Sequence, residues 1–294
     1  MELHPLTFTR FDRPPLSPDD PLAVVWRGRD NKPDVIAKRI DGWCWFRVVD
    51  LASYRFPAES PELHVSCIAD PEEGAGREAV TDGYYRYVVP LALQVYGLEA
   101  MHGTAVETPA GAVALCGRSH AGKTTLTYAL FRSGYRVLAD DGLVVDPTGA
   151  DGSPAVQPIP FALMIREASA EHFGTTVRER VRVAEEAPVL TVPPVPLAAV
   201  VLVNRVEGAT IALEPLPKAE AYTSLLGRSY VFSFDDPVRK RALVSAYARF
   251  ANTVPVYRLT YPDGLDAIDT AVSAIEGLVE SLAGRRASTS STDA

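Results

Sequence analysis

The sequence contains few cysteines and no long apolar run. Its three cysteines, Cys44, Cys67 and Cys116, are widely spaced and form no Cys-x-x-Cys pair. This spacing supports neither a disulfide framework nor a structural zinc site. No apolar stretch approaches the ~20 residues needed to cross a bilayer. The segment Met1–Asp12 also lacks the basic and apolar parts of a signal peptide. We therefore expect a cytoplasmic protein with reduced thiols and no membrane partner.

The chain also lacks an excess of positive charge. It has 29 Lys and Arg against 37 Asp and Glu, a formal net charge of -8. This balance offers nothing to attract nucleic acid, so we expect no nucleic-acid partner. With 47% hydrophobic residues in 294, the chain is globular in composition and long enough for one large domain or two small ones.

Short aromatic or β-branched runs separated by turn-forming residues occupy the N-terminal part of the chain. They predict antiparallel strands at Leu22–Trp26, Val35–Lys38, Trp43–Val49 and Leu63–Ile68. The segment Glu78–Tyr96 has helical spacing and an interruption near Pro90, and its tyrosines are expected to face the core. We take residues 1–97 as a β-rich region plus a helix. Its simplest role is to extend the core sheet, and a substrate-docking or dimerisation module is the alternative.

The remaining chain alternates strands and helices. An apolar strand, Gly111–Cys116, precedes a helix, Thr124–Ser133, and a second strand, Arg136–Asp140, follows. This order is typical of a nucleotide-binding α/β unit. Later segments predict further strands and helices, namely strands at Leu143–Val145, Leu197–Val203 and Tyr257–Thr260 and helices at Ala219–Leu226, Val238–Ala251 and Leu265–Leu282. Residues 285–294 are small and polar and predict a flexible tail.

The strongest motif lies between the first strand and helix of this unit. It reads Gly117-Arg118-Ser119-His120-Ala121-Gly122-Lys123-Thr124, a complete G-x-x-x-x-G-K-[ST] P-loop, with Thr125 next in the helix. The glycines let backbone N–H groups point at phosphate oxygens, and the helix N-terminus adds its dipole. Lys123 would contact the β- and γ-phosphates, and Thr124 would offer its hydroxyl to Mg²⁺. The motif predicts binding of a nucleoside triphosphate with Mg²⁺.

Two adjacent carboxylates, Asp140 and Asp141, end the second strand of the unit. One could hold Mg²⁺ while the other accepts a proton from an attacking hydroxyl. Since Gly142 follows, a simple Asp-Asp-Gly turn is the alternative interpretation. Two histidines are further candidates: His102 lies upstream of the P-loop strand and could bond an acidic group or a phosphate, and His120 lies inside the loop.

These motifs together resemble a known family. Met101-His102-Gly103, the P-loop and Leu138-Ala139-Asp140-Asp141 are similar in type and order to the C-terminal catalytic domain of HPr kinase/phosphorylase. They are closer to its short HprK-like relatives, some of which phosphorylate a serine of a ribosomal peptide precursor, as in some lasso-peptide pathways. The resemblance covers roughly Leu98–Gly284, so we place an HprK-like kinase domain at residues 98–284.

The resemblance implies an α/β fold related to phosphoenolpyruvate carboxykinase, with the P-loop at the edge of a largely β core. It also implies ATP and Mg²⁺ as cofactors and an oligomeric assembly. Asp140 would match the base that activates the acceptor hydroxyl, Asp141 the carboxylate on the metal side, and His102 the histidine beside them.

The sequence departs from the bifunctional enzymes of that family in two places. Arg118, His120 and Ala121 occupy a loop centre that is richer in glycine and serine in those enzymes. The glycine-rich signature after the acidic pair is also absent, and Gln157–Glu167 stands in its region. Arg166 in that segment could neutralise charge on the transferred phosphoryl group. The resemblance therefore does not extend to HPr as substrate or to phosphorylase activity.

Three functions remain compatible with these motifs. The first is a phosphotransferase that moves the γ-phosphoryl group of ATP to a serine or threonine hydroxyl of a peptide or small protein. The second is a kinase of a small hydroxyl compound such as free serine. The third is an NTPase switch or accessory protein, in which nucleotide state alters a partner contact. The adjacent carboxylates favour the first, because hydroxyl activation requires a nearby proton acceptor.

Overall fold

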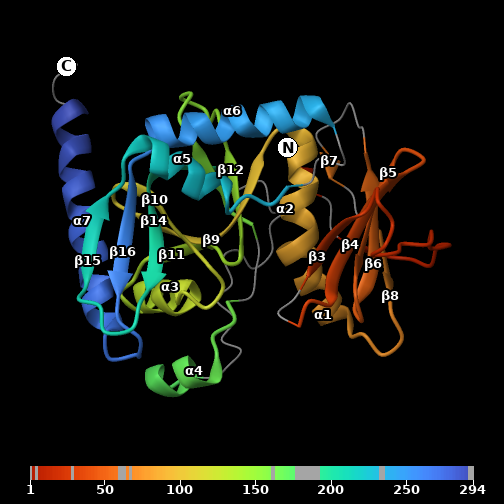
Figure 1. Ribbon diagram of the computed structural model, residues 1–294, viewed down its shortest axis with the longest axis horizontal. Helices are drawn as coiled ribbons and strands as arrows, with labels where there is room; N and C mark the ends of the chain where they lie inside the picture. Colours follow the sequence, from red (N-terminus) through yellow and green to blue (C-terminus); the bar gives the residue numbers. More distant parts are fainter. Residues whose placement is uncertain are drawn as a thin grey trace.

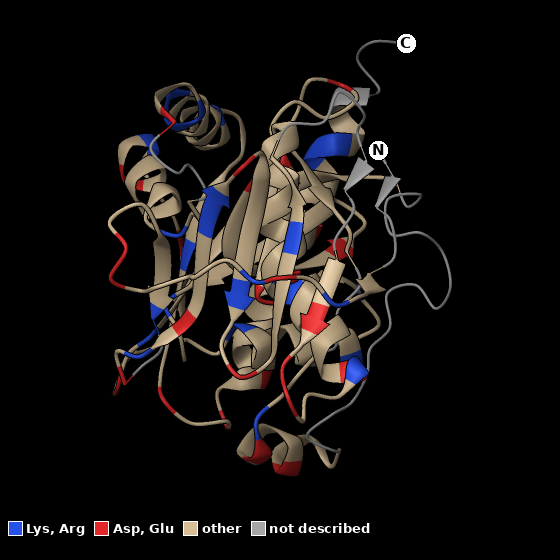
Figure 2. Ribbon diagram, turned by 90° about the vertical axis from the view of Figure 1, so that its right-hand side faces the viewer, with Lys and Arg blue, Asp and Glu red and all other residues tan. Residues whose placement is uncertain are grey.

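Two large β-sheets flank a helical run in the computed structural model of the protein (Figure 1). The structure describes residues 2–3, 6–27, 30–58, 64–65, 68–159, 163–175, 193–231 and 236–290. It is a mixed α/β protein. Acidic and basic positions are interspersed along the ribbon in the view of Figure 2. Within the described ranges, no helix is both long and apolar enough to span a bilayer.

The N-terminal sheet has six strands in the order β2-β8-β6-β5-β4-β3. Their bounds are β2 (Thr7–Phe8), β3 (Val24–Arg27), β4 (Pro33–Ile40), β5 (Trp43–Val48), β6 (Ala52–Pro57) and β8 (Ile68–Pro71), and β1 (Glu2–Leu3) pairs separately with β7 (His64–Val65). The first three strand predictions are confirmed. The sequence interpretation missed β6. Of the strand predicted at residues 63–68, His64–Val65 form β7 and Ile68 begins β8, and residues 63, 66 and 67 lie outside the described residues. Because this sheet has its own strand order, the expectation that it extends the core sheet is wrong.

A continuous helical run follows this sheet and packs against it. It comprises α1 (Arg77–Gly83), the π-helical turn η1 (Tyr84–Val88), α2 (Val89–Ala92) and the 3-10 turn η2 (Leu93–Tyr96). The irregular helix predicted here is therefore present. Tyr84 is fully buried against the N-terminal sheet, as expected. Tyr87 is 39% exposed, so the expectation that it faces the core is wrong.

The second sheet has eight strands and contains the predicted nucleotide-binding unit. Its strands are β9 (Glu99–Thr108), β10 (Gly111–Gly117), β11 (Arg136–Ala139), β12 (Gly142–Asp146), β13 (Ala155–Gln157), β14 (Val195–Arg205), β15 (Ala212–Pro215) and β16 (Val256–Tyr261). The pairings β10–β9, β9–β12, β12–β13, β13–β14 and β14–β10 close a ring. Strand β10 thus lies between β9 and β14 inside the sheet, and the loop after it emerges from the end of a central strand.

Helices cover both faces of the parallel strands β10, β14 and β16. On one face lie α3 (Lys123–Arg132) and α7 (Ile268–Ser290), and on the other α5 (Lys218–Leu226) and α6 (Pro237–Thr253). A short helix, α4 (Glu167–Phe173), contacts the outer side of α3 through Phe173 and Tyr128. Side chains of β10 alternate between the two apolar layers, which explains why this strand is entirely buried.

The C-terminal end differs from the sequence expectation. Helix α7 continues to Ser290, so residues 285–290 of the predicted flexible tail are helical. Arg286 in this extension donates a hydrogen bond of 2.6 Å to the carbonyl oxygen of Ala110, next to β10. This contact stabilises the last turns of the helix against the sheet. Residues 291–294 lie outside the described residues.

Candidate functional site

The loop between β10 and α3 turns sharply through left-handed backbone conformations. His120 has φ 68° and Gly122 has φ 91°. A Cβ atom on Gly122 would lie 1.9 Å from the hydroxyl oxygen of Tyr261, which itself donates a 2.7 Å hydrogen bond to the Ala121 carbonyl. Only glycine meets both constraints at this position. No side chain caps the N-terminus of α3, so its first N–H groups are available to an anion.

Lys123 is held inside this loop rather than extended into solvent. The residue is only 6% exposed. The ammonium nitrogen donates to the carbonyl oxygens of Gly117 and Arg118, each at 3.2 Å, and to Nε2 of His102 at 2.9 Å. Burial lowers the pKa of Lys123. A negatively charged phosphate oxygen would form a stronger hydrogen bond to this ammonium group than the neutral carbonyl oxygens do. The position of Lys123 therefore favours anion binding.

Thr124 and Asp140 contact each other directly. The Thr124 hydroxyl donates to Oδ1 of Asp140 at 3.0 Å. Asp140 is only 3% exposed, and burial raises its pKa to about 6. Arg86 opposes this shift, whereas the neighbouring carboxylate of Asp141 reinforces it. A carboxylate buried in this way lowers the stability of the folded protein at neutral pH.

Replacing Asp140 by asparagine should therefore stabilise the metal-free protein, and the gain should depend on pH. The folded-state pKa of about 6 exceeds the usual value of 3.8, so wild-type stability falls as pH rises from about 4 to about 6. The difference corresponds to at most about 3 kcal/mol at pH 7. Urea unfolding of both proteins in EDTA at pH 4 and pH 7 measures it. An equal gain at both pH values would assign the effect to packing instead of charge.

Asp141 occupies a different environment from its neighbour. It has φ 67° and its side chain is 34% exposed. Nη1 of Arg86 lies 3.2 Å from Oδ2, and Nδ1 of His102 lies 3.3 Å from Oδ1. Nδ1 of His102 is also 2.9 Å from the hydroxyl of Tyr230. Burial and the charge of Lys123 lower the pKa of His102, so a neutral ring that accepts at Nε2 and donates from Nδ1 fits its partners.

Strand register explains why His102 lies between the loop and the carboxylates. In β9, His102 pairs with Gly142 of β12, and the next residue, Gly103, pairs with Cys116 of β10. A Cβ atom on Gly103 would lie 2.8 Å from Sγ of Cys116, so glycine permits this close approach. A Cβ atom on Gly142 would lie 2.7 Å from Pro90 of the helical run. Both glycines therefore have a structural role in bringing three segments together.

The predicted site residues converge on one pocket of about 380 Å³, which we call the loop pocket. Its lining includes ten of them, namely His102, Ser119, His120, Gly122, Lys123, Thr124, Thr125, Asp140, Asp141 and Arg166. Nη2 of Arg166 contacts Nε2 of His120 at 3.1 Å, which ties the start of α4 to the loop. Gly117 does not line this pocket, although its carbonyl oxygen accepts a hydrogen bond from Lys123, and Arg118 and Ala121 line a different pocket.

The donors in the loop pocket fit Mg²⁺ bound together with phosphates. Mg²⁺ in nucleotide sites takes one or two protein oxygens and completes its shell with phosphate and water. Thr124 and Asp140 place a hydroxyl and a carboxylate oxygen side by side, with Asp141 next in the chain. Among the described residues, no group of three or more His, Cys, Asp or Glu is placed to hold a metal ion. The hydroxyl of Thr124 and the carboxylate of Asp140 are the one or two protein oxygens that Mg²⁺ takes in a nucleotide site.

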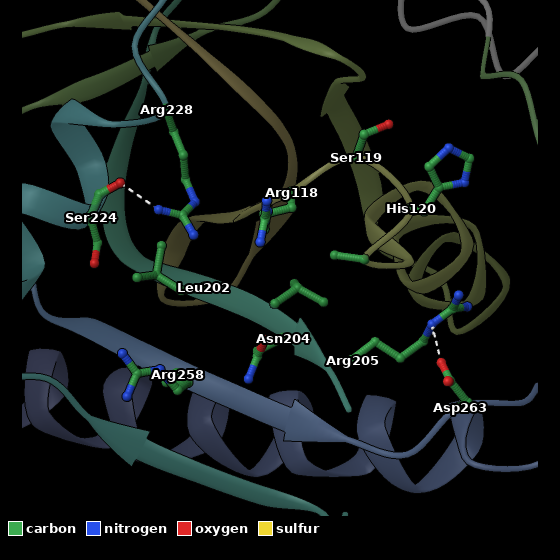
Figure 3. A pocket seen from close by; sticks show the side chains of 12 residues that line it. Arg118, Ser119, His120, Leu202, Asn204, Arg205, Ser224, Arg228, Arg258 and Asp263 are labelled. Carbon is green, nitrogen blue, oxygen red and sulfur yellow. Dashed lines mark hydrogen bonds and ion pairs between the residues drawn. The ribbon is translucent and has the colours of Figure 1, made fainter. Parts of the chain in front are cut away.

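A second pocket, of about 680 Å³, lies on the other side of the loop, and we call it the arginine pocket. Arg118, Arg228 and Arg258 surround it in Figure 3. Arg205 also lines it, but its Nε atom is paired with Asp263 at 2.6 Å, and Arg258 is paired with Glu220. These ion pairs reduce the positive charge available to a bound anion.

The structure also reveals site residues that the sequence interpretation missed. They are Arg86, Tyr230 and Ser169, which contact Asp141, His102 and Thr125 respectively. Arg86 lies in a segment whose helical spacing indicated only core packing. Ser169 and Tyr230 follow no motif, and no local pattern marks either of them.

Comparisons with known proteins identify no family for this chain. No family model and no curated protein matches the chain. Among solved structures, the chain is similar to the Hpr(Ser) kinase/phosphatase from Coxiella burnetii, with 12% sequence identity and a TM-score of 0.35. That match covers 65% of this chain and 96% of the other. It is a distant match to a kinase of the type that the motifs resemble, and so weak a likeness carries no functional argument.

Proposed function

We propose that the protein is a phosphotransferase that moves the γ-phosphoryl group of ATP to a serine or threonine hydroxyl of a peptide or small protein. The observation that carries this proposal is the convergence of Lys123, the Thr124–Asp140 pair and Asp141 on the loop pocket. Phosphoryl transfer depends on positioning and charge neutralisation more than on covalent chemistry. These groups supply both at the N-terminus of a helix.

Each group has a role that follows from its position. The backbone N–H groups of the loop and Lys123 would bind the phosphates, and Arg166 would add positive charge from the start of α4. Thr124 would be a ligand of Mg²⁺, which neutralises phosphate charge when bound. One carboxylate of the acidic pair would complete the metal site, and the other would accept the proton of the attacking hydroxyl.

Two observations bear differently on which carboxylate is the base. The pKa of Asp140, raised to about 6, lies in a useful range for a general base, in agreement with the role that the family resemblance implies. However, Asp140 is almost fully buried and bonded to Thr124. Asp141 is more exposed and contacts His102. The contact with Thr124 favours Asp140 as the metal ligand. The greater exposure of Asp141 favours it as the base that accepts the proton of the acceptor hydroxyl.

The test follows labelled γ-phosphate from ATP and Mg²⁺ to a panel of serine peptides, free serine, HPr and buffer alone. We expect label on a peptide serine, with loss of transfer in EDTA. Asn variants of Asp140 and Asp141 should each lower kcat by about 10²- to 10⁴-fold, because the base or a metal ligand is lost. Asp146→Asn at the far end of β12 is the matched control and should stay near wild type.

The other outcomes identify the alternative functions. Label on free serine but on no peptide would indicate a small-molecule kinase. Label released only as inorganic phosphate, or ATP bound and kept intact, would contradict the kinase proposal and indicate a nucleotide-dependent switch. Binding of nucleotide measured in the same samples by calorimetry separates a failure to bind from a failure to transfer.

A further inference from the structure

A third pocket, of about 540 Å³, opens where the N-terminal sheet, the helical run and the 117–124 loop meet. We call it the aromatic pocket. Trp26 of β3 and Asp34 of β4 line it from the sheet, and Tyr87 and Leu91 line it from the helical run. The two regions that the sequence separates at residue 97 therefore both contribute to one cavity beside the loop.

The aromatic pocket and the loop pocket share part of their lining. The shared residues are Arg86, His102, Ser119 and Asp141. Asp140, in contrast, lines only the loop pocket. The carboxylate of Asp141 thus lies on the boundary between the two cavities. A molecule in the aromatic pocket could reach this carboxylate while a nucleotide occupies the loop pocket, which is the arrangement that a transfer between two substrates requires.

The chemistry of the aromatic pocket selects among possible acceptors. Trp26, Tyr87 and Leu91 offer rings and an apolar side chain, and Tyr87 is 39% exposed. Asp34 adds an exposed carboxylate beside them. A small polar compound such as free serine has no apolar group to place against these side chains. A peptide with an apolar residue next to its hydroxyl, and a basic residue nearby, complements both features.

We propose that the aromatic pocket binds the phosphoryl acceptor, a serine or threonine of a peptide segment flanked by an apolar side chain. This inference rests on the proposed function and adds the acceptor site to it. The acceptor oxygen forms the new bond to the γ-phosphorus, and the bond from that phosphorus to the bridging oxygen breaks. The electron pair of the broken bond leaves with ADP, and the hydroxyl proton passes to the carboxylate of Asp141.

The proposal is tested by peptide binding to the full chain loaded with ADP and Mg²⁺. Two fluorescent nonapeptides carry one central serine and one lysine, with phenylalanine flanking the serine in the first and alanine in the second. Anisotropy should show the phenylalanine peptide bound about 10-fold more tightly, since each apolar contact contributes about that factor. Trp26→Ala should remove the difference. Tyr87→Ala, at a partly exposed position, should weaken the phenylalanine peptide similarly.

The matched control is Trp43→Ala. Trp43 is a tryptophan of the same sheet that packs under Arg55 at 4.6 Å and does not line the aromatic pocket. Its replacement should change peptide affinity less than about twofold, as is usual away from a contact surface. Equal affinity for the two peptides, no binding of the phenylalanine peptide, or wild-type affinity in both Trp26→Ala and Tyr87→Ala would each overturn the proposal.

The same titrations separate this inference from the function on which it rests. ADP and Mg²⁺ affinity is measured in each variant before peptide is added. If nucleotide binds normally and the peptides show no pocket-dependent preference, only the acceptor site is wrong. If the wild type binds no nucleotide, the proposed function itself fails. Competition by free serine at concentrations as low as those at which the unlabelled phenylalanine peptide competes would overturn the choice of a peptide as acceptor.

Discussion

Replacement of Lys123 by alanine is expected to lower phosphoryl transfer from ATP by about 10³-fold, the upper range for losing one oriented donor to a developing negative charge. The ammonium group is buried at the start of α3, where its effect is not screened by bulk water. The ammonium group also donates to the carbonyl oxygens of the loop, which hold it at the place where the phosphates would bind. The measurement is kcat/KM for label transfer.

The control for this variant comes from the same helix. Arg132→Ala removes a positive charge at the other end of α3, where the side chain donates to the carbonyl of Phe173. We expect it to change transfer less than about threefold, because its charge lies about two and a half turns from Lys123 and is exposed to screening. A loss below 10-fold in Lys123→Ala, with normal folding, would contradict the assignment of this lysine to the transferred phosphates.

Replacement of Arg239 by alanine should destabilise the protein by about 3–5 kcal/mol, the usual cost of leaving one partner of a buried ion pair alone. Both terminal nitrogens of this α6 residue contact the carboxylate of Glu99 in β9 at 2.7 Å. Glu99 is only 1% exposed, and burial raises its pKa even with the arginine present. Urea unfolding at pH 7 gives the free energy of unfolding directly.

Two further variants identify the cause of that loss. Arg241→Ala, at an exposed position two residues along α6, should change stability by less than about 0.5 kcal/mol. Glu99→Gln in the Arg239→Ala background should recover part of the loss, because it removes the uncompensated charge. If the double variant has the same free energy of unfolding as Arg239→Ala alone, then packing of the arginine side chain, not its charge, stabilises the contact between α6 and β9.

The sequence predicts the segments of the site well where the information is local. The loop, its strand and its helix occupy one contiguous stretch, so the glycines and Lys123 identify them without knowledge of the fold. The acidic pair is recognisable because it ends the next strand. The family resemblance predicts His102 near the carboxylates, and the register of β9 against β10 and β12 supplies the physical reason for that position. The functional roles of these residues remain predictions.

Other features of the site depend on contacts between distant segments and leave no local pattern. Arg86 and Asp141 are 55 residues apart, and His102 and Tyr230 are 128 apart. Helical spacing alone indicates the buried face of a helix, and it cannot show that Arg86 meets a carboxylate from another sheet. The separate N-terminal sheet was missed for a similar reason, since alternation predicts strands but not which sheet they join.

The number of residues in the π-helical turn η1 determines where Arg86 points relative to the site. A π turn holds one residue more than an α turn, and each residue rotates the helix by roughly 100°. Within it, Tyr84 and Val88 pack in the N-terminal core and Arg86, between them, contacts Asp141, while the extra residue sets the rotation of α2 relative to α1. Removing one residue from η1 would leave every other side chain in place in the sequence. It would nevertheless rotate either the core-facing side chains away from the N-terminal sheet or Arg86 away from Asp141. The number of residues in this turn is thus as much a part of the site as their identity.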